Sequence, residues 1–100
     1  MTTPVVVTAI AKQDVRDILT YLHETADYAV ARSYGEDFKR AYRDIALWPG
    51  SGAPRPALGP NTRIKVVWPY VVIYEHDEAR ATVLRVLYGR RKITARMIER

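Results

Sequence analysis

The apolar residues of this chain are densest between residues 63 and 88, where they form three runs separated by short turns. The runs are rich in β-branched and aromatic residues, a composition typical of strands that pack on at least one face. They lie at residues 63–68, 70–74 and 82–88. The last two are apolar almost throughout, which predicts central strands buried on both faces. We therefore expect a meander whose first strand lies nearer an edge.

The first of these runs alternates between two kinds of side chain. One face carries the cations Arg63 and Lys65, and the other carries Ile64, Val66 and Trp68. Successive side chains of a strand point to opposite faces of the sheet. The alternation therefore predicts one basic face and one face that belongs to the core.

A short strand and an amphipathic helix begin the chain. Residues 4–8 are mostly valine, and Pro4 suits the first position of a strand because its missing N–H is least costly there. Thr8 has the side chain of a helix N-cap. Apolar residues then recur at i, i+3, i+4 and i+7, which predicts a helix from residue 9 to residue 23 or 24; they are Val15, Ile18, Leu19 and Leu22.

A second amphipathic helix follows. Asp27 is its candidate N-cap, apolar residues recur at helical spacing as far as Ile45, and the sequence at residues 48–50, Trp-Pro-Gly, ends it. Gly35 costs about 1 kcal/mol relative to alanine in a helix, so we expect it to mark a close approach to the first helix. The two helices predict an αα-hairpin whose apolar face packs on the meander.

The remaining segments are a loop and a tail. Residues 49–60 hold four of the six prolines and form the one long loop, in which Arg55 stands between Pro54 and Pro56 and can be aimed rigidly. Residues 92–100 predict a short helix or tail that docks weakly on the sheet. The expected order is β-αα-βββ with a short C-terminal helix or tail, an α+β fold in a single domain of residues 1–100.

Charge and composition narrow the classes of partner. The net charge is +5, and it is uneven: residues 1–50 hold six Lys/Arg against seven Asp/Glu, whereas residues 51–100 hold ten against four. Three cations directly follow the last predicted strand, at residues 90–92. This asymmetry favours an anionic partner, either nucleic acid or an acidic protein segment. The chain has no cysteine and no apolar run long enough to span a bilayer, so we expect a cytoplasmic protein without membrane contact.

The sequence offers little catalytic chemistry. His23 and His76 fall in different elements and have no metal-ligand spacing, so we expect neither a metal site nor a cofactor. Ser33 and Ser51 have no neighbouring base that could activate them. Metal-independent RNA cleavage needs an acid, a base and cations for the phosphorane. Those roles could fall to Arg63, Lys65, Arg85, Tyr88, Arg90 and Arg91, although rows of Arg and Lys are more often a plain binding surface.

Taken together, the motifs of the chain resemble the ParE branch of the RelE/ParE toxin superfamily, the toxin halves of bacterial toxin–antitoxin pairs. The resemblance spans nearly the whole chain. It rests on Asp14, Asp17 and Tyr21 in the first helix, on the pattern from Trp48 to Leu58 that includes Pro49, Gly52 and Arg55, on Arg63, on Tyr70, Ile73 and Tyr74, and on the run from Val83 to Arg91. It implies the same fold that the apolar pattern predicts, a helical hairpin on a small, mostly antiparallel sheet.

The resemblance implies two alternative activities on one scaffold. ParE-like toxins inhibit DNA gyrase by trapping it on cleaved DNA, whereas RelE-like relatives cut mRNA in the ribosome. The RNases keep basic residues at Arg63, Lys65 and Arg91, with Tyr88 as a further candidate. They also use an arginine where this chain has Val71 and a tyrosine near Met97. Valine and methionine cannot neutralise a phosphorane or move a proton, so we expect a gyrase inhibitor with no catalytic residues.

The resemblance also implies the partners. The expected partner is a cognate ParD-like antitoxin, which forms a hetero-oligomer with the toxin and connects it indirectly to DNA. An acidic antitoxin tail is expected on the face of Arg63, Lys65 and Arg90 or in the groove of the helical hairpin. A toxin that has lost activity and serves only as the antitoxin's partner in autorepression is a third reading. The residues expected to bind target or antitoxin are Arg55, Arg63, Lys65, Arg85, Tyr88, Arg90 and Arg91. ParE-like chains often have histidine where Tyr88 stands.

Overall fold

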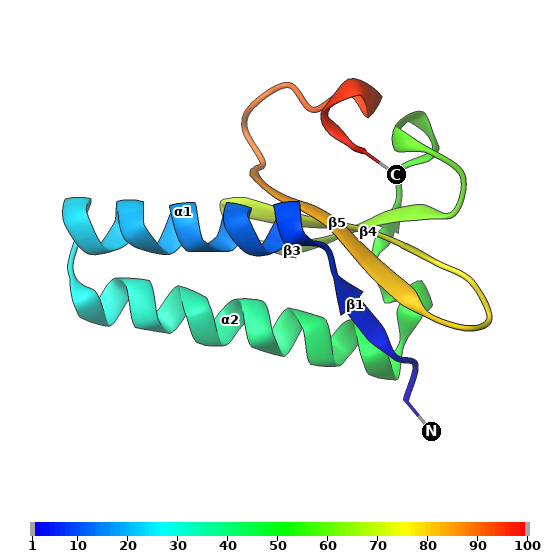
Figure 1. The fold of residues 1–100 in the computed structure, drawn as a ribbon, viewed down its shortest axis with the longest axis horizontal. Helices are drawn as coiled ribbons and strands as arrows, with labels where there is room; N and C mark the ends of the chain where they lie inside the picture. The colour runs from blue at the N-terminus through cyan, green and yellow to red at the C-terminus, as the bar shows by residue number, and fades with distance from the viewer. Residues whose placement is uncertain (1, 100) are drawn as a thin grey trace.

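The computed structural model describes residues 2–99 and has two antiparallel helices packed on one face of a five-stranded sheet (Figure 1). The class is α+β, as the sequence predicts. The helices are α1 (Ala9–Thr25) and α2 (Tyr28–Leu47). The strands are β1 (Val5–Val7), β2 (Ala53–Pro54), β3 (Thr62–Val67), β4 (Tyr70–His76) and β5 (Ala81–Tyr88). Three short 3₁₀ turns complete the described part of the chain, at Pro49–Ser51, Pro56–Leu58 and Ala95–Met97.

The strands lie in the order β1-β5-β4-β3-β2. β3, β4 and β5 form the predicted antiparallel meander, and β1 pairs in parallel with β5, with Val5 opposite Ala81 and Val7 opposite Val83. The prediction that the two apolar runs are central is confirmed, because β4 and β5 each have a strand on both sides. Their position explains why they carry so few polar side chains.

Both helix N-termini begin at the residues that the sequence predicts. The side chain of Thr8 accepts a hydrogen bond from the Ala11 N–H at 3.2 Å, and Asp27 accepts one from the Val30 N–H at 2.9 Å. Each cap satisfies one backbone donor that has no partner inside the helix, which stabilises a helix by about 1 kcal/mol. Thr8 also donates to the Leu84 carbonyl at 3.2 Å, so its cap joins α1 to β5.

The helices cover one face of the sheet with the main hydrophobic core. Phe38 and Ile45 of α2 are almost fully buried against the sheet, and aromatic rings pack edge to face where Phe38, Tyr34 and Tyr70 meet. This is the packing of hairpin on meander that the periodicity predicts. The other core residues on this face are Ala11, Ala41, Val72, Tyr74, Ala81, Val83 and Val86.

A second, smaller apolar cluster covers the opposite face. Its buried members come from the strands and from the segments that fold over them: Leu58, Val71, Ile73, Leu84, Leu87 and Ile98. The C-terminal segment, red in Figure 1, curls back over this face, and its Ile93 and Met97 pack at the edge of the cluster. The predicted tail therefore docks on the sheet with one buried residue, Ile98.

Residues 49–60 are more ordered than the predicted loop. Ala53 and Pro54 pair with Ile64 and Arg63 as β2, which the sequence analysis missed because two residues carry no periodicity. The buried Tyr74 hydroxyl donates to the Pro49 carbonyl at 2.6 Å and accepts from the backbone N–H of residue 52 at 2.9 Å.

Gly52 fits where no other residue would. A Cβ at this position would lie 2.6 Å from the Ile64 carbonyl oxygen and 2.6 Å from the Tyr74 hydroxyl. Real Cβ contacts do not come so close, so the glycine allows the turn to press against β3 and β4. Gly35 was expected to mark a close approach of the two helices. A Cβ at this position would lie 3.7 Å from Leu19 Cδ1, which is an ordinary contact, so the helices are not unusually close there. α1 and α2 do not need a glycine in order to approach each other.

The two faces of β3 differ from the prediction. Arg63 and Lys65 lie opposite Tyr74 and Val72, which belong to the helix-side core, so the cations are on the helix side of the sheet. The predicted core face is wrong at Val66, which is 57% exposed, and at Trp68, which is 64% exposed. Val66 lies in a strand near the edge of the sheet and outside the smaller apolar cluster, and Trp68 lies in the turn after β3, which ends at Val67 rather than at residue 68.

Candidate functional site

Two turns meet at the end of the sheet where β3 passes into β4 and where β5 ends. The Gly89 N–H donates to the Pro69 carbonyl at 2.7 Å, and the Arg91 N–H donates to the Tyr88 carbonyl at 3.2 Å. A Cβ at Gly89 would lie 3.0 Å from the Pro69 carbonyl oxygen, tighter than most real contacts. The glycine therefore lets the chain after β5 close against the β3–β4 turn, which places Arg90 and Arg91 there.

Trp68 and Arg90 form an exposed pair at this end. The Arg90 guanidinium lies 5.4 Å from the centre of the Trp68 ring, within the range of a cation–π interaction. Tryptophan and arginine are both enriched among the few residues that contribute most of the binding energy of protein interfaces. The sequence analysis placed Trp68 on the core face and missed it as a site residue, although its position directly before a turn proline was a usable signal.

Tyr88 lies beside this pair, on the helix side of the sheet. Its ring packs edge to face on Tyr70 at 6.0 Å between centroids, and its side chain is 43% exposed. Burial raises the pKa of Tyr70 above its ordinary value, and the neighbouring tyrosines add to the effect. Tyr88 and Tyr70 line a groove of about 430 Å³ with Asp17, Ile18 and Tyr21. Sequence reasoning did not identify the exposed Tyr21 as part of this site.

Arg63 and Lys65 lie elsewhere and are held by local contacts. Arg63 donates to the Gly52 carbonyl at 2.7 Å. Lys65 donates to Ser51 Oγ at 3.1 Å and lies 3.9 Å from a carboxylate oxygen of Asp44 in α2. The structure therefore does not assemble a single face from Arg63, Lys65 and Arg90.

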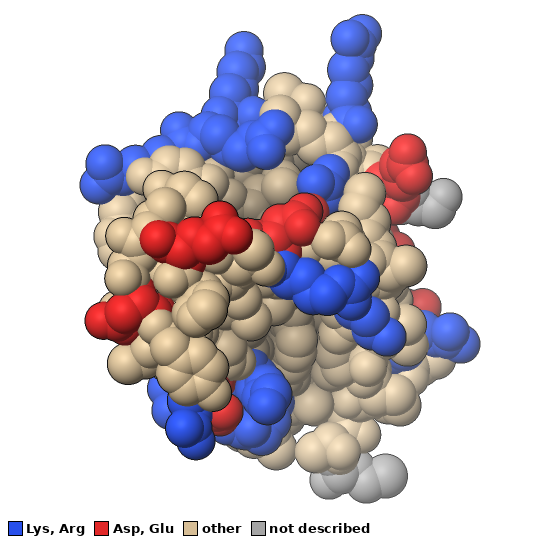
Figure 2. Space-filling model, turned by 60° about the vertical axis from the view of Figure 1, so that its left-hand side comes forward, with Lys and Arg blue, Asp and Glu red and all other residues tan. Residues whose placement is uncertain are grey.

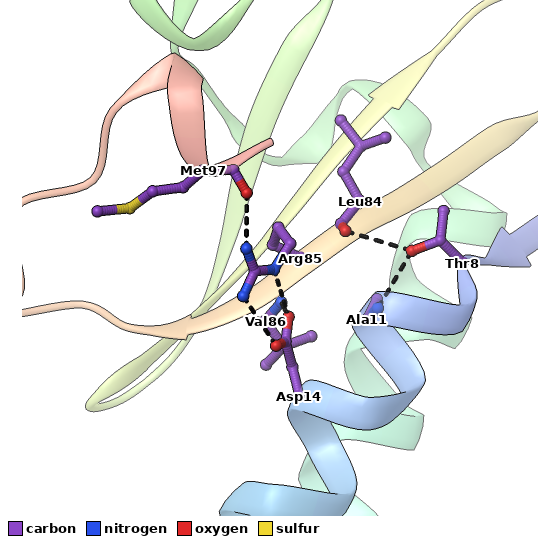
Figure 3. A network of polar contacts seen from close by, with 7 residues as sticks. All are labelled: Thr8, Ala11, Asp14, Leu84, Arg85, Val86 and Met97. Carbon is purple, nitrogen blue, oxygen red and sulfur yellow. Dashed lines mark hydrogen bonds and ion pairs between the residues drawn. The ribbon is translucent and has the colours of Figure 1, made fainter. Parts of the chain in front are cut away.

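Arg85 was predicted as a site residue, but its guanidinium is hydrogen-bonded within the protein (Figure 3). Its Nε and Nη2 donate to both carboxylate oxygens of Asp14 at 2.8 and 3.0 Å, and its Nη1 donates to the Met97 carbonyl at 2.6 Å. The Asp14 hydrogen bond is the main cause that raises the pKa of Arg85 further above its ordinary value, so the guanidinium stays charged. Asp14 also accepts the Val86 N–H at 3.0 Å. Arg85 thus joins α1, β5 and the C-terminal segment.

Arg55 remains an exposed cation on the loop. Its Nη1 donates to the carbonyl of the neighbouring Pro54 at 3.0 Å. Its backbone N–H donates to the Thr62 carbonyl at 2.8 Å, which fixes the backbone at Arg55 next to β3. The side chain is therefore placed by a rigid backbone but is open to solvent.

The surface charge is divided rather than continuous. Figure 2 shows lysine and arginine side chains in separate groups, with a band of acidic side chains between them, on the face that it presents. Separated groups of cations favour short acidic segments as partners over a long nucleic-acid backbone, because phosphates repeat along the whole length of a strand. The cations at residues 90–92 form the group at the candidate site.

A second candidate surface is the groove of the helical hairpin. It has a volume of about 590 Å³ and is mostly apolar. Its lining includes the small residues Gly35 and Ala31 and the cations Arg32 and Lys39. Burial raises the pKa of Tyr42, which also lines this groove, and the nearby Asp14 adds to the shift. The groove has the dimensions and composition to receive an apolar helix face or side chains.

The positions that could support RNA cleavage are filled by packing residues. Val71 is buried in the smaller apolar cluster, and Met97 packs against the same cluster while its carbonyl accepts from Arg85. Arg63 and Lys65 contact α2 and the 51–52 turn, whereas Tyr88 and Arg91 lie at the end of the sheet. Across residues 2–99 the structure has no group of three or more potential metal ligands, and no helix there is long and apolar enough to cross a membrane.

Comparisons with known proteins agree with this geometry. A structure of the chromosomal ParDE TA system from P. aeruginosa matches with a TM-score of 0.71 and 19% identity, over 84% of this chain and 92% of that chain. At that identity the match shows a shared fold. No curated protein matches the chain in sequence. The family model described as "ParE toxin of type II toxin-antitoxin system, parDE" matches residues 5–93. The chain therefore belongs to the ParE toxin family of type II toxin–antitoxin systems.

Proposed function

We propose that this ParE toxin inhibits DNA gyrase by stabilising the enzyme's complex with cleaved DNA, and that a ParD-like antitoxin neutralises it. The observation that carries the proposal is the match of the ParE toxin family over residues 5–93. The packing of Val71 and Met97 in an apolar cluster supports inhibition by binding rather than by RNA cleavage. Neither side chain can take part in proton transfer or charge neutralisation.

The candidate gyrase-binding surface is the end of the sheet formed by Trp68, Tyr88, Arg90 and Arg91. Exposed tryptophan, tyrosine and arginine side chains contribute most to protein interfaces when a partner desolvates them. Arg55 stands on a separate loop and is a secondary candidate. Arg85 is excluded from the surface because its guanidinium is satisfied by Asp14 and the Met97 carbonyl.

For the antitoxin, we favour the groove of the helical hairpin as one docking site. An apolar groove of about 590 Å³ between two helices suits the apolar face of an amphipathic segment that folds on binding. Arg32 and Lys39 at this groove would attract acidic residues on the flank of such a segment.

The test is to incubate the purified chain with gyrase, supercoiled plasmid and ATP, and then to look for linear DNA after detergent and protease treatment. Linear product that disappears when the cognate antitoxin is added supports both parts of the proposal. No linear product at a large molar excess of toxin removes the gyrase mechanism. Translating ribosomes would then be examined for mRNA cut in the A site.

Paired arginine variants sharpen this test. Arg90→Ala removes one cation from the proposed surface, and we expect a loss of about 1–3 kcal/mol of binding if gyrase buries this contact. Arg80→Ala removes an exposed arginine at the other end of the same sheet and serves as the matched control. An equal loss in both variants would mean that overall charge, rather than this surface, matters. A loss of turnover by several orders of magnitude in an mRNA assay would instead indicate catalysis.

A further inference from the structure

The outer edge of β3 is paired over only part of its length. β2 pairs Ala53 with Ile64 and Pro54 with Arg63 and ends there. Beyond Ile64, no strand of the described part of the chain lies next to β3 on this side. The edge that remains open runs from Lys65 to Val67, where β3 ends; in the turn that follows, the Trp68 carbonyl accepts a hydrogen bond from the Tyr34 hydroxyl at 3.2 Å.

The hydrogen bonds on either side of β3 reveal which backbone groups face this open edge. The Thr62 carbonyl accepts from Arg55, on the side of β2, whereas the Asn61 carbonyl accepts from His76, on the side of β4. Because the N–H and C=O of one strand residue point the same way and alternate along the strand, even-numbered residues of β3 face outward. Val66 therefore directs both its N–H and its C=O away from β4, to the open edge.

The side chains beside this edge are apolar and exposed. Val66 is 57% exposed, and it faces away from the helices because it lies opposite Val71 of the smaller apolar cluster. Trp68, in the turn that follows β3, is 64% exposed. An open strand edge with neighbouring apolar side chains is a template for pairing with another chain, and proteins usually cover or block such edges. Here the nearest lysine, Lys65, turns toward Ser51 and Asp44 on the helix side and does not block the edge.

A groove runs between this edge and α2. It has a volume of about 430 Å³, and residues 65–68 form one wall. The other wall carries Asp37, Arg40 and Asp44, and its charges are balanced locally, because Arg40 lies 3.2 Å from Asp37 and Lys65 lies 3.9 Å from Asp44. Every second side chain of an added strand would point into this groove. Because the charges of the groove are already paired, an uncharged polar side chain of the added strand would lose less on desolvation there than a charged one.

We propose that the open edge of β3 receives an extended acidic segment of the antitoxin as an additional strand. The proposal rests on the proposed function for the identity of the partner. The backbone of the segment would bond to Val66, an apolar side chain would cover Val66 and Trp68, and a carboxylate would reach the cations at residues 90–92. Main-chain bonds supply affinity and alternate side chains supply specificity in this mode of recognition.

Charge and hydrogen-bond geometry favour this occupant over two others. A second copy of the chain would bring a net charge of +5 against the same charge and would place Arg90 near its own equivalent. Nucleic acid would satisfy the cations but offers no backbone that repeats donor and acceptor at the spacing of a β-ladder. An acidic peptide strand meets both requirements.

The test uses one residue and the intact chain with its full-length cognate antitoxin. Val66→Pro removes the outward N–H and leaves the β3–β4 ladder intact, because proline is tolerated where the N–H of an edge strand faces outward. Val66→Thr keeps the N–H and the β-branched shape and is the control. We expect Val66→Pro to weaken the complex about tenfold, the effect of losing one hydrogen bond at an interface, and Val66→Thr to leave it nearly unchanged. Equal affinity of all three proteins overturns the proposal.

Amide hydrogen exchange of the unsubstituted protein provides a test that does not depend on how the proline variant folds. We expect the Val66 amide to become protected in the complex and to exchange fast in the free chain. A complex in which Val66 remains unprotected overturns the proposed strand and leaves neutralisation by the antitoxin standing. No complex at all removes the proposed neutralisation and the strand with it. Protection in the free chain that grows with concentration would assign the edge to a second copy and overturn the proposal.

A charge variant completes the experiment. Arg90→Glu reverses one cation beside Trp68, and Arg80→Glu reverses an exposed arginine at the opposite end of the sheet. We expect the first to weaken antitoxin binding about tenfold and the second to have little effect, because surface charges act over roughly one Debye length of about 8 Å. Equal effects of the two variants would contradict a carboxylate at residues 90–92.

Discussion

The two faces of this sheet are made by the same strands but are covered in different ways. Two helices of 17 and 20 residues cover one face, and they bury Phe38, Ile45 and Tyr74 almost completely. The other face is covered by the C-terminal segment and by the turn at Leu58, and this cover stops short of Val66 and Trp68. The first face holds the fold together, whereas the second leaves apolar surface available to a partner.

The difference follows from how many residues each cover can contribute. A long helix presents a residue to the core at every turn, whereas a 3₁₀ turn of three residues presents one or two. The smaller cluster is therefore narrower than the sheet that it covers, and the strand nearest the edge stays exposed. Both candidate surfaces, the end of the sheet near Arg90 and the open edge of β3, lie beyond the reach of the smaller cluster.

The largest loss of stability should come from a substitution on the face of the sheet that the helices cover. Phe38→Ala would leave a cavity where three aromatic rings meet, and we expect it to lower the free energy of unfolding by about 3–5 kcal/mol. Urea denaturation followed by circular dichroism would measure this loss. A change below about 1 kcal/mol would mean that the helix face is not the main core.

A somewhat smaller loss of stability should come from the Asp14–Arg85 contact, through which helix α1 is connected to the C-terminal segment. Asp14→Ala leaves the Arg85 guanidinium and the Val86 N–H without their acceptor, and we expect a loss of about 3 kcal/mol. Asp17→Ala is the matched control, because Asp17 is exposed on the same helix and accepts its hydrogen bond from Gln13, an exposed neighbour one helical turn away. Similar urea midpoints for the two variants would show that Arg85 does not depend on Asp14.

A substitution on the face covered by the C-terminal segment should lower the free energy of unfolding less than one on the helix face. Ile98→Ala removes a buried side chain near the C-terminus, and we expect a loss of about 2 kcal/mol, at the low end for such a change because a terminal segment can detach locally. Hydrogen exchange should then show faster exchange in residues 93–98 and unchanged exchange in α2. A global loss equal to that of Phe38→Ala would mean that the two faces fold as one core.

The smallest effect, and the only stabilising one, is expected between the helices. Gly35→Ala adds a methyl group 3.7 Å from Leu19 Cδ1, where it has room, and removes a flexible residue from α2. We expect a gain of up to about 1 kcal/mol. Gly52→Ala is the contrasting variant, since its Cβ would collide with the Ile64 carbonyl, and it should destabilise the protein. A loss of stability in both would mean that α1 and α2 pack more tightly than the geometry indicates.

Elements that depend on neighbouring residues were predictable. Thr8 and Asp27 were identified as helix caps because a cap needs only a side-chain oxygen and the next turn of backbone. The central position of β4 and β5 followed from their composition. The resemblance to ParE toxins, carried by motifs from Asp14 to Arg91, is confirmed by the family match over residues 5–93.

Contacts between distant residues were not predictable in the same way. An arginine such as Arg85 is usually a surface cation. Nothing near it in the chain indicates that Asp14, 71 residues away, accepts its hydrogen bonds. Trp68 is a large apolar residue of the kind that usually packs in a core, but β3 ends at Val67 and leaves Trp68 exposed in the turn. Arg63 and Lys65 were expected on the open face of β3, and the pairing with Tyr74 and Val72 places them on the helix side.

The sequence by itself determined the helices, the meander, their order and the toxin family, because periodicity, caps and motifs are local properties of the chain. Only the tertiary structure decided which cations are free to meet a partner and which apolar residues remain uncovered. The physical reason is that exposure and ion pairing depend on what the rest of the chain places beside a residue. Arg85 and Arg90 are five residues apart, yet the first is partly buried and hydrogen-bonded to Asp14, whereas the second is exposed and lies over the Trp68 ring.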